Sequence, residues 1–237
     1  MSRPRRIGGY AGAGAALLAL ASATVSYGGS TRPAGPVPAH QAIVATALGR
    51  VPVYHAPGAH RAFVTYSHSN GYGQPRVFLV AQRLPGWEKV YLPQRPNGST
   101  GWVRDSSVNL AYDRYRVVVS LLTHRLRAYN TGRLFISVKA GVGRSVSATP
   151  TGTYFLVMLL KQPDPTGLYG PYAFGTSAFS NTYYHFGGGP GEIGLHGTDY
   201  PQGLGTNVSH GCIRVSNAII RRLAKLLPLG TPVVIER

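Results

Sequence analysis

Turn-forming residues interrupt the chain so often between residues 43 and 110 that a long helix does not fit there. Glycine, proline and asparagine separate short apolar runs at 51–54, 76–80, 87–92 and 101–103, and these runs carry no helical periodicity. Short strands joined by tight turns give this pattern, because turns need the backbone conformations that these residues supply. The sequence therefore predicts a small all-β module over residues 43–110.

The aromatic residues of this module give it a more specific character. The module resembles bacterial SH3-like modules in three features: a strand with Trp87, an Asn-Gly turn at 97–98 and a closing run at 101–103. The resemblance implies a small barrel. The two tryptophans, Trp87 and Trp102, are expected to be core aromatics.

A second β-rich region starts at residue 115. Apolar or alternating runs at 116–122, 125–129, 134–138, 151–157 and 233–235 predict strands. A single helix is expected near the C-terminus, capped by Ser216 or Asn217. Its apolar face consists of Ile219, Ile220, Leu223, Leu226 and Leu227. The predicted fold class is mainly β, with a small barrel followed by a larger β domain that carries this helix.

The first residues have the features of a secretory signal. Arg3, Arg5 and Arg6 precede an uncharged stretch over 7–23 that ends in the small-residue pattern Ala-Ser-Ala. This predicts a signal peptide, residues 1–23, cleaved after Ala23. An uncleaved membrane anchor is the alternative, because the uncharged run continues to residue 31. In both cases the bulk of the protein is exported, behind a Pro/Gly/Ser-rich linker over residues 24–42.

The chain is strongly basic, with a net charge of +17, and stays so after the signal peptide is removed. For an exported protein this favours an acidic cell wall or membrane surface as the environment. The arginines are scattered and form no basic helix or zinc-finger spacing, so we expect no nucleic-acid partner.

The chain has one cysteine, Cys212, so it cannot form an internal disulfide bond. Nearby lie His196, His210 and Arg214, whose imidazoles and positive charge favour the thiolate form that acts as a nucleophile. Gly211 leaves room for a substrate carbonyl, and the amides of Gly211 and Cys212 are candidates for an oxyanion hole. Cys212 is therefore a candidate nucleophile.

Three other roles for Cys212 stay open at this point. The thiol is inert and buried, or forms an intermolecular bridge, or binds zinc together with His185, His196 and His210. The spacing of these residues matches no common zinc motif, so we expect neither a metal nor another cofactor.

Three motifs together resemble the L,D-transpeptidase catalytic domain of the YkuD type, which remodels bacterial peptidoglycan. They are "TPTGTYF" at 149–155, "HGT" at 196–198 and "SHGCIRVSN" at 209–217, and the resemblance covers residues 115–237. It implies a β-sandwich with the cysteine at one end of a cleft. The resemblance also implies that carbapenems inhibit the protein by acylating the thiol.

Matching the motifs residue by residue implies a set of site residues. Cys212 matches the nucleophile and His196 the general base, with His210 as a further catalytic or turn-shaping residue. Ser209, Gly211 and Gly197 shape the site, and Arg214 and Asn217 are candidates for binding substrate. Tyr184 is added because aromatic residues over 161–191 suit a mobile lid on the cleft. The alternative is that Tyr183 and Tyr184 pack in the core or line a strand.

The implied reaction starts when Cys212 attacks the bond before D-Ala in a stem tetrapeptide, which releases D-Ala and leaves a thioester. The side-chain amine of a second stem peptide then forms a cross-link. Two alternatives remain: an L,D-carboxypeptidase, in which water resolves the thioester, and a non-catalytic, basic cell-wall-binding protein.

Overall fold

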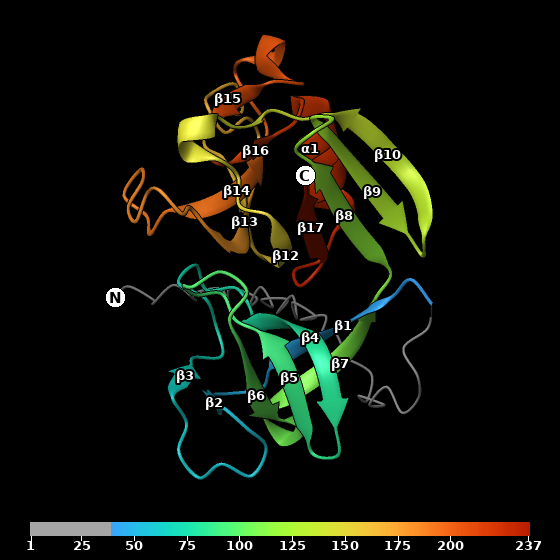
Figure 1. Ribbon diagram of the computed structural model, residues 1–237. Coiled ribbons are helices and arrows are strands. Elements are labelled where there is room, and N and C mark those ends of the chain that lie inside the picture. The colour runs from blue at the N-terminus through green and yellow to red at the C-terminus, as the bar shows by residue number, and fades with distance from the viewer. Residues whose placement is uncertain (1–38) are drawn as a thin grey trace, which may run out of the picture. The chain divides into compact units, whose positions relative to one another are not determined.

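The computed structural model describes residues 39–237. The predicted signal peptide, residues 1–23, and most of the predicted linker, residues 24–42, lie outside the described residues. Within the described range, no helix is both long enough and apolar enough to cross a membrane. The predicted fold class is confirmed: the structure is mainly β, with a single α-helix near the C-terminus among the described residues (Figure 1).

The N-terminal part forms a five-stranded antiparallel sheet in the order β6-β5-β4-β1-β7, with a separate two-stranded sheet β2-β3. Its apolar residues form one core that includes Phe78, Val90 and Val103. The domain boundaries and the SH3-like character of this part stay predictions. The elements are β1 (Ala42–Ala47), β2 (Val51–Val53), β3 (Val64–Tyr66), β4 (Val77–Leu84), β5 (Trp87–Tyr91), β6 (Thr100–Arg104), the 3₁₀ turn η1 (Asp105–Ser107) and β7 (Val108–Asp113).

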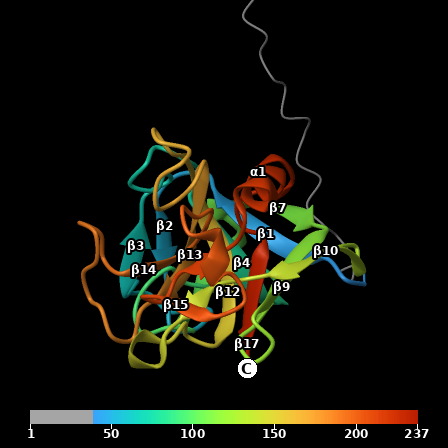
Figure 2. The same cartoon turned by 90° about the horizontal axis from the view of Figure 1, so that it is seen from above.

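The C-terminal part is an eight-stranded mixed sheet in the order β10-β9-β8-β17-β12-β13-β14-β16. Strands from both halves of this sheet and α1 contribute to one core, so the sheet curls around the helix (Figures 1 and 2). The strands are β8 (Tyr115–Ser120), β9 (Arg125–Asn130), β10 (Arg133–Lys139), β12 (Gly152–Lys161), β13 (Tyr172–Phe179), β14 (Glu192–His196), β16 (Ile213–Arg214) and β17 (Pro232–Glu236).

The helix α1 (Asn217–Leu226) begins where the sequence predicts it, because the Ser216 side chain accepts a hydrogen bond from the Ile219 amide. Its residues Ile220 and Leu223 are fully buried. The remaining elements are β11 (Val142–Gly143), which pairs in parallel with β15 (Asn207–Ser209), and the 3₁₀ turns η2 (Ser145–Ser147) and η3 (Pro201–Gly203).

The interpretation of residues 161–191 as one lid is wrong for its middle. Tyr172–Phe179 form β13, which pairs with β12 on one side and β14 on the other. Only the residues on either side of β13 are loops, and the second of these loops, residues 180–191, leads into β14.

The N-terminal part meets the second sheet along β12. Leu159 exchanges two backbone hydrogen bonds with the Gln74 side chain, at 3.1 and 2.7 Å, and the Val157 carbonyl accepts from Asn70 at 3.0 Å. A small apolar cluster that includes Val77 and Phe155 fills the same contact. These contacts place the segment around Tyr72 beside the cleft described below.

Candidate active site

A cleft of about 330 Å³ lies over β12, β13 and β14 and contains both Cys212 and His196. The loop before β14 contributes Phe186, four glycines and Pro190, and the N-terminal part contributes Tyr72. The other lining residues are Met158, Leu160, Gln162, Tyr169, Ala173, Phe174, Gly175, Glu192 and Gly194.

Strand pairing brings the cysteine and the histidine together. The two-residue strand β16, which starts directly after Cys212, runs parallel to β14 with His196 opposite Arg214. Along β14, Ile193 and Leu195 are buried in the core, so the alternate residues face the cleft. Cys212 is therefore level with Gly194 on the neighbouring strand, two residues before His196.

Gly194 supplies the space in which the two side chains meet. A Cβ atom on this residue would lie 3.5 Å from Cδ2 of His196 and 3.7 Å from Sγ of Cys212. The Gly194 N–H donates to Sγ at 3.3 Å. A residue without a side chain at this position thus lets the thiol and the imidazole face a common volume.

His196 is arranged to accept a proton at Nε2. The side chain is buried, and Nδ1 lies 2.6 Å from the Gly197 carbonyl oxygen, an acceptor that requires the proton on Nδ1. Burial is the largest influence on its pKa, and the charge of Arg214 acts in the same direction, so the pKa falls to about 4. The imidazole is therefore neutral at neutral pH, with its Nε2 lone pair available.

The Cys212 thiol is also neutral at rest. Burial raises its pKa, while the Gly194 amide and the Arg214 charge lower it without outweighing burial. This corrects the expectation that the surroundings raise the thiolate fraction before substrate binds. A thiolate at this position would need a base to take the proton, and the neutral His196 faces the same volume.

Buried hydroxyl groups fix the turn that carries Cys212. The Ser209 hydroxyl accepts from the Gly211 amide at 3.0 Å and donates to the Cys212 carbonyl at 2.6 Å. Thr149 donates to the Gly211 carbonyl at 2.7 Å. Gly211 has a φ of 126°, and a Cβ there would come within 2.8 Å of Cδ1 of Ile193, so the turn requires glycine.

The same contacts change the predicted oxyanion hole. The Gly211 amide is occupied by Ser209, so it does not point at a substrate. Between residues 39 and 237 the Cys212 amide has no acceptor, which leaves it as the backbone donor beside the thiol.

His210, predicted as a catalytic residue, lies at the surface under the loop before β14. Its Nε2 is 2.6 Å from Nη2 of Arg144, which can only donate. Its ring contacts those of Tyr183 and Phe186, with centroids 5.8 and 5.2 Å apart. The lone pair of Nε2 is thus committed to Arg144, which speaks against a role in proton transfer.

Asn217 and Gly197 hold the segment after β14. Oδ1 of Asn217 accepts from the Thr198 amide at 2.9 Å, and a Cβ on Gly197 would overlap that oxygen. The amide group therefore positions the backbone next to His196, and a contact of Asn217 with substrate stays a prediction.

Of the two other predicted substrate-binding residues, Arg214 lies close enough to His196 and Cys212 for its charge to act on both, although it does not line the cleft. Its charge lowers the pKa of both His196 and Cys212, and its Nε is buried without a hydrogen-bond partner in residues 39–237. Tyr184 is 67% exposed and does not line the cleft, because its ring packs 4.7 Å from the Arg95 guanidinium.

Several residues of the cleft were not among the predicted site residues, although Tyr169 lies in the segment 161–191 that is expected beside the cleft. Tyr169 packs edge-on against His196, with ring centroids 4.9 Å apart. Glu192, whose pKa is raised by burial, and Gly194 precede His196 at even spacing on β14, and this spacing is a signal that was available. Tyr72 had no such signal, because it comes from the other sheet.

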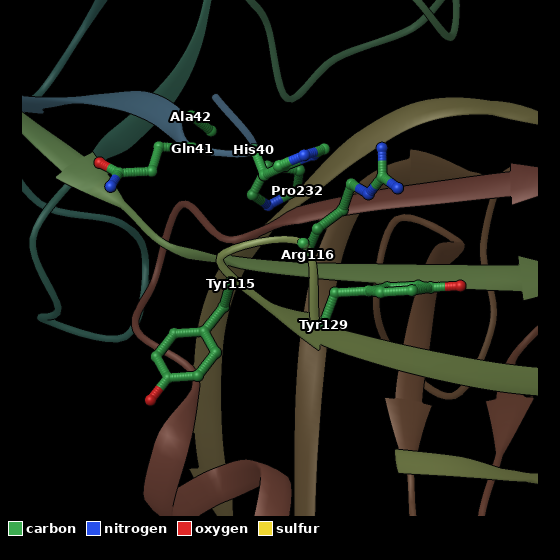
Figure 3. A pocket seen from close by; sticks show the side chains of 8 residues that line it. His40, Gln41, Ala42, Tyr115, Arg116, Tyr129 and Pro232 are labelled. Atoms are coloured by element: carbon green, nitrogen blue, oxygen red, sulfur yellow. The ribbon is translucent and has the colours of Figure 1, made fainter. Parts of the chain in front are cut away.

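Neither a metal site nor a second reactive pocket emerges from the described part of the chain. No three His, Cys, Asp or Glu side chains of residues 39–237 gather so that they could hold a metal ion. A smaller cavity of about 100 Å³ holds Arg116 over the Tyr129 ring at 5.3 Å and contains no cysteine (Figure 3). It is lined by His40, Gln41, Ala42, Tyr115, Arg116, Tyr129, Gly132 and Pro232.

Comparison with known proteins identifies the family. Residues 114–235 match the family model of the L,D-transpeptidase catalytic domain, YkuD. Over 121 residues the chain is 36% identical to a Bacillus licheniformis protein that bears the name L,D-transpeptidase YkuD. This match covers 51% of this chain and 65% of that protein. Its namesake in Bacillus subtilis strain 168 is 32% identical over 123 residues, covering 52% of this chain and 66% of that protein.

The chain thus spans just under two thirds of these curated relatives. Among solved structures, Bdellovibrio bacteriovorus Bd1075 is 31% identical, with 52% of this chain and 48% of that chain covered and a TM-score of 0.40. An L,D-transpeptidase from Mycobacterium tuberculosis H37Rv is 17% identical, with coverages of 83% and 98% and a TM-score of 0.48. Because the family model matches half of its length, this protein belongs to the YkuD-type L,D-transpeptidase catalytic domain family.

Proposed function

We propose that this protein is an exported L,D-transpeptidase that cross-links peptidoglycan stem peptides through a thioester on Cys212. The observation that carries the proposal is the pairing of a neutral thiol with a neutral imidazole above Gly194, in a cleft open to a peptide. Cleavage of the signal peptide after Ala23 and residence at an acidic cell wall belong to the same proposal.

In the first half-reaction, Sγ of Cys212 gives its proton to Nε2 of His196 and attacks the carbonyl carbon that precedes D-Ala. The negative charge on the carbonyl oxygen is stabilised by the Cys212 amide. The imidazolium then returns the proton to the nitrogen of D-Ala as the C–N bond breaks. D-Ala leaves, and the donor peptide stays on Sγ as a thioester.

In the second half-reaction, the side-chain amine of a second stem peptide attacks the thioester. His196 takes the proton from the attacking nitrogen and gives it to Sγ as the C–S bond breaks. The product is an amide between the third residues of two stem peptides, and the free thiol is restored. A positive charge at Arg214 suits the carboxylate of the departing D-Ala.

The test uses the full chain and a matched Cys212→Ala variant with a disaccharide-tetrapeptide substrate. The expected result is a cross-linked dimer with release of D-Ala in the wild type and no product with the variant, read by mass spectrometry. Formation of the tripeptide without any cross-linked dimer would mean that the protein is an L,D-carboxypeptidase. Equal behaviour of the two proteins would replace the proposal by a wall-binding function.

Intact-protein mass spectrometry with a carbapenem tests the first half-reaction alone. The expected result is one covalent adduct on the wild type and none on Cys212→Ala. A folded wild-type protein without an adduct would contradict an activated thiol.

A further inference from the structure

The loop over residues 180–191 covers the cleft and makes few contacts within itself. The Ser180 amide donates to the Gly191 carbonyl at 2.8 Å, and the Ser180 hydroxyl accepts from the amides of Thr182 and Tyr183 at 3.2 and 3.0 Å. The loop contains four glycines, at 187, 188, 189 and 191, and apart from one isolated bridge between Phe186 and Gly189 it has no regular structure. Glycine-rich segments lose much conformational entropy when they are ordered. Contacts from outside the loop therefore add to the order that these few bonds supply.

One residue of the N-terminal part contacts both ends of this loop. The Arg95 guanidinium donates to the Pro190 carbonyl at 2.8 Å, to the Ser180 carbonyl at 3.0 Å and to the Tyr183 carbonyl at 2.9 Å. The first of these carbonyls lies at the end of the loop and the other two at its start. A single planar group with several donors thus ties the two ends together.

The surroundings of Arg95 strengthen this connection. The guanidinium packs against the rings of Phe179 and Tyr184, each 4.7 Å from its centroid. Gly191 is held close: a Cβ there would lie 3.1 Å from Nη2 of Arg95 and would overlap the Tyr183 carbonyl.

A second residue of the N-terminal part, Asn97, anchors the strand end from which the loop leaves. Its side-chain oxygen accepts from the Phe179 amide at 2.8 Å, and its side-chain nitrogen donates to the Phe179 carbonyl at 2.7 Å. The same nitrogen donates to Asn181 at 3.2 Å. The base of the loop is therefore fixed independently of Arg95.

We infer that Arg95 is a positioning residue that holds the loop 180–191 over Cys212, so that the N-terminal part is a working component of the peptide-binding cleft. The part of this inference that concerns substrate rests on the proposed function. Through the loop, Arg95 shapes the wall formed by Phe186 and the glycines, and this wall contacts a peptide before any bond is broken. Its loss should weaken substrate binding more than it slows the chemical steps.

The experiment compares Arg95→Ala and Arg95→Lys with the wild-type full chain. Arg104→Ala is the matched control, because Arg104 lies in the same part and packs on Trp87 at 4.7 Å but does not contact the loop. In Arg95→Ala, KM for the tetrapeptide should rise by at least about tenfold with a much smaller change in kcat, which is the size of effect that loss of one charged hydrogen bond produces. Arg95 contacts Pro190 through Nη1 and the other two carbonyls through Nη2, and a single lysine ammonium cannot take both places, so Arg95→Lys should show the same split.

Two further readouts separate the inference from the proposed function. Hydrogen–deuterium exchange in residues 181–191 should become faster in both Arg95 variants and stay unchanged in Arg104→Ala. A small thiol reagent should modify Cys212 faster when the loop is released, whereas peptide turnover becomes less efficient. Both readouts apply even if the wild type proves to have no transpeptidase activity.

Wild-type exchange in the loop and a wild-type KM in Arg95→Ala would overturn the inference. So would an equal fall in kcat and in thermal stability without faster exchange in the loop, because that pattern belongs to a residue that only stabilises the fold.

Discussion

Replacing Gly194 by alanine inserts one methyl group into the volume that the thiol and the imidazole share. The new Cβ would lie 3.5 Å from Cδ2 of His196, 3.7 Å from Sγ of Cys212 and 3.3 Å from the Phe174 carbonyl oxygen. The first two distances are ordinary contacts, and the third requires a shift of a few tenths of an ångström. The free energy of unfolding should change by no more than about 1 kcal/mol, because alanine also lowers the entropy of the unfolded chain.

The effect on the chemistry should be much larger. A carbonyl group must approach Sγ to about 3–3.5 Å, and the methyl group occupies part of that approach. The rate of carbapenem acylation should fall about 100-fold, which corresponds to about 3 kcal/mol in the activation barrier. Time-resolved mass spectrometry measures this rate, and urea unfolding measures the stability of the same sample.

The matched control is Gly71→Ala, where a Cβ would have nothing within 4 Å. It should leave both measurements at their wild-type values. Acylation of Gly194→Ala at the wild-type rate would refute the shared volume, and so would a loss of rate that is fully explained by unfolding.

Three further predictions follow from the buried groups of the site. Because the pKa of His196 falls from 6.5 to about 4, the neutral imidazole persists in mild acid, and carbapenem acylation should stay constant down to about pH 5 and be halved near pH 4. A half-point near 6.5 in the folded protein would contradict this. The depressed pKa of His196 also affects the free energy of unfolding. Its contribution is fully present above pH 6.5 and decreases by about 3 kcal/mol as the pH falls to 4, because only the unfolded chain takes up the proton in this range. The unfolding of His196→Gln, which should lack this pH dependence, checks the sign. Ser209→Ala should lower the free energy of unfolding by about 2–4 kcal/mol and slow acylation, because the amide of Gly211 and the carbonyl of Cys212 lose their buried partner. A midpoint of chemical denaturation equal to that of the wild type would count against this prediction.

Local patterns were sufficient to predict much of the fold. The hairpin formed by β9 and β10 carries its turn signal at 130–133, and the apolar face of α1 follows a clear cap at Ser216. Strand β13 escaped prediction because it contains Gly175 and few branched residues. Its place depends on the neighbouring strand, since the Met158 side chain fills the space above that glycine.

For the candidate site too, the sequence predicts some features and not others. Cys212 and His196 lie in short motifs that the sequence displays directly. The directions of the His210, Asn217 and Tyr184 side chains depend on partners distant in the chain, such as Arg144 for His210 and Arg95 for Tyr184. No periodicity or spacing encodes those pairings, which is why the contacts of these three residues differ from expectation.

The uncharged resting state of Cys212 has a consequence for the lifetime of the protein. Peroxides and disulfides react with thiolates and much more slowly with protonated thiols. A sulfur that is protonated at rest presents the reactive anion to oxidants for only a small fraction of the time. For a protein with a single cysteine and no second thiol to rescue it by disulfide exchange, the protonated resting state protects that sulfur from oxidation.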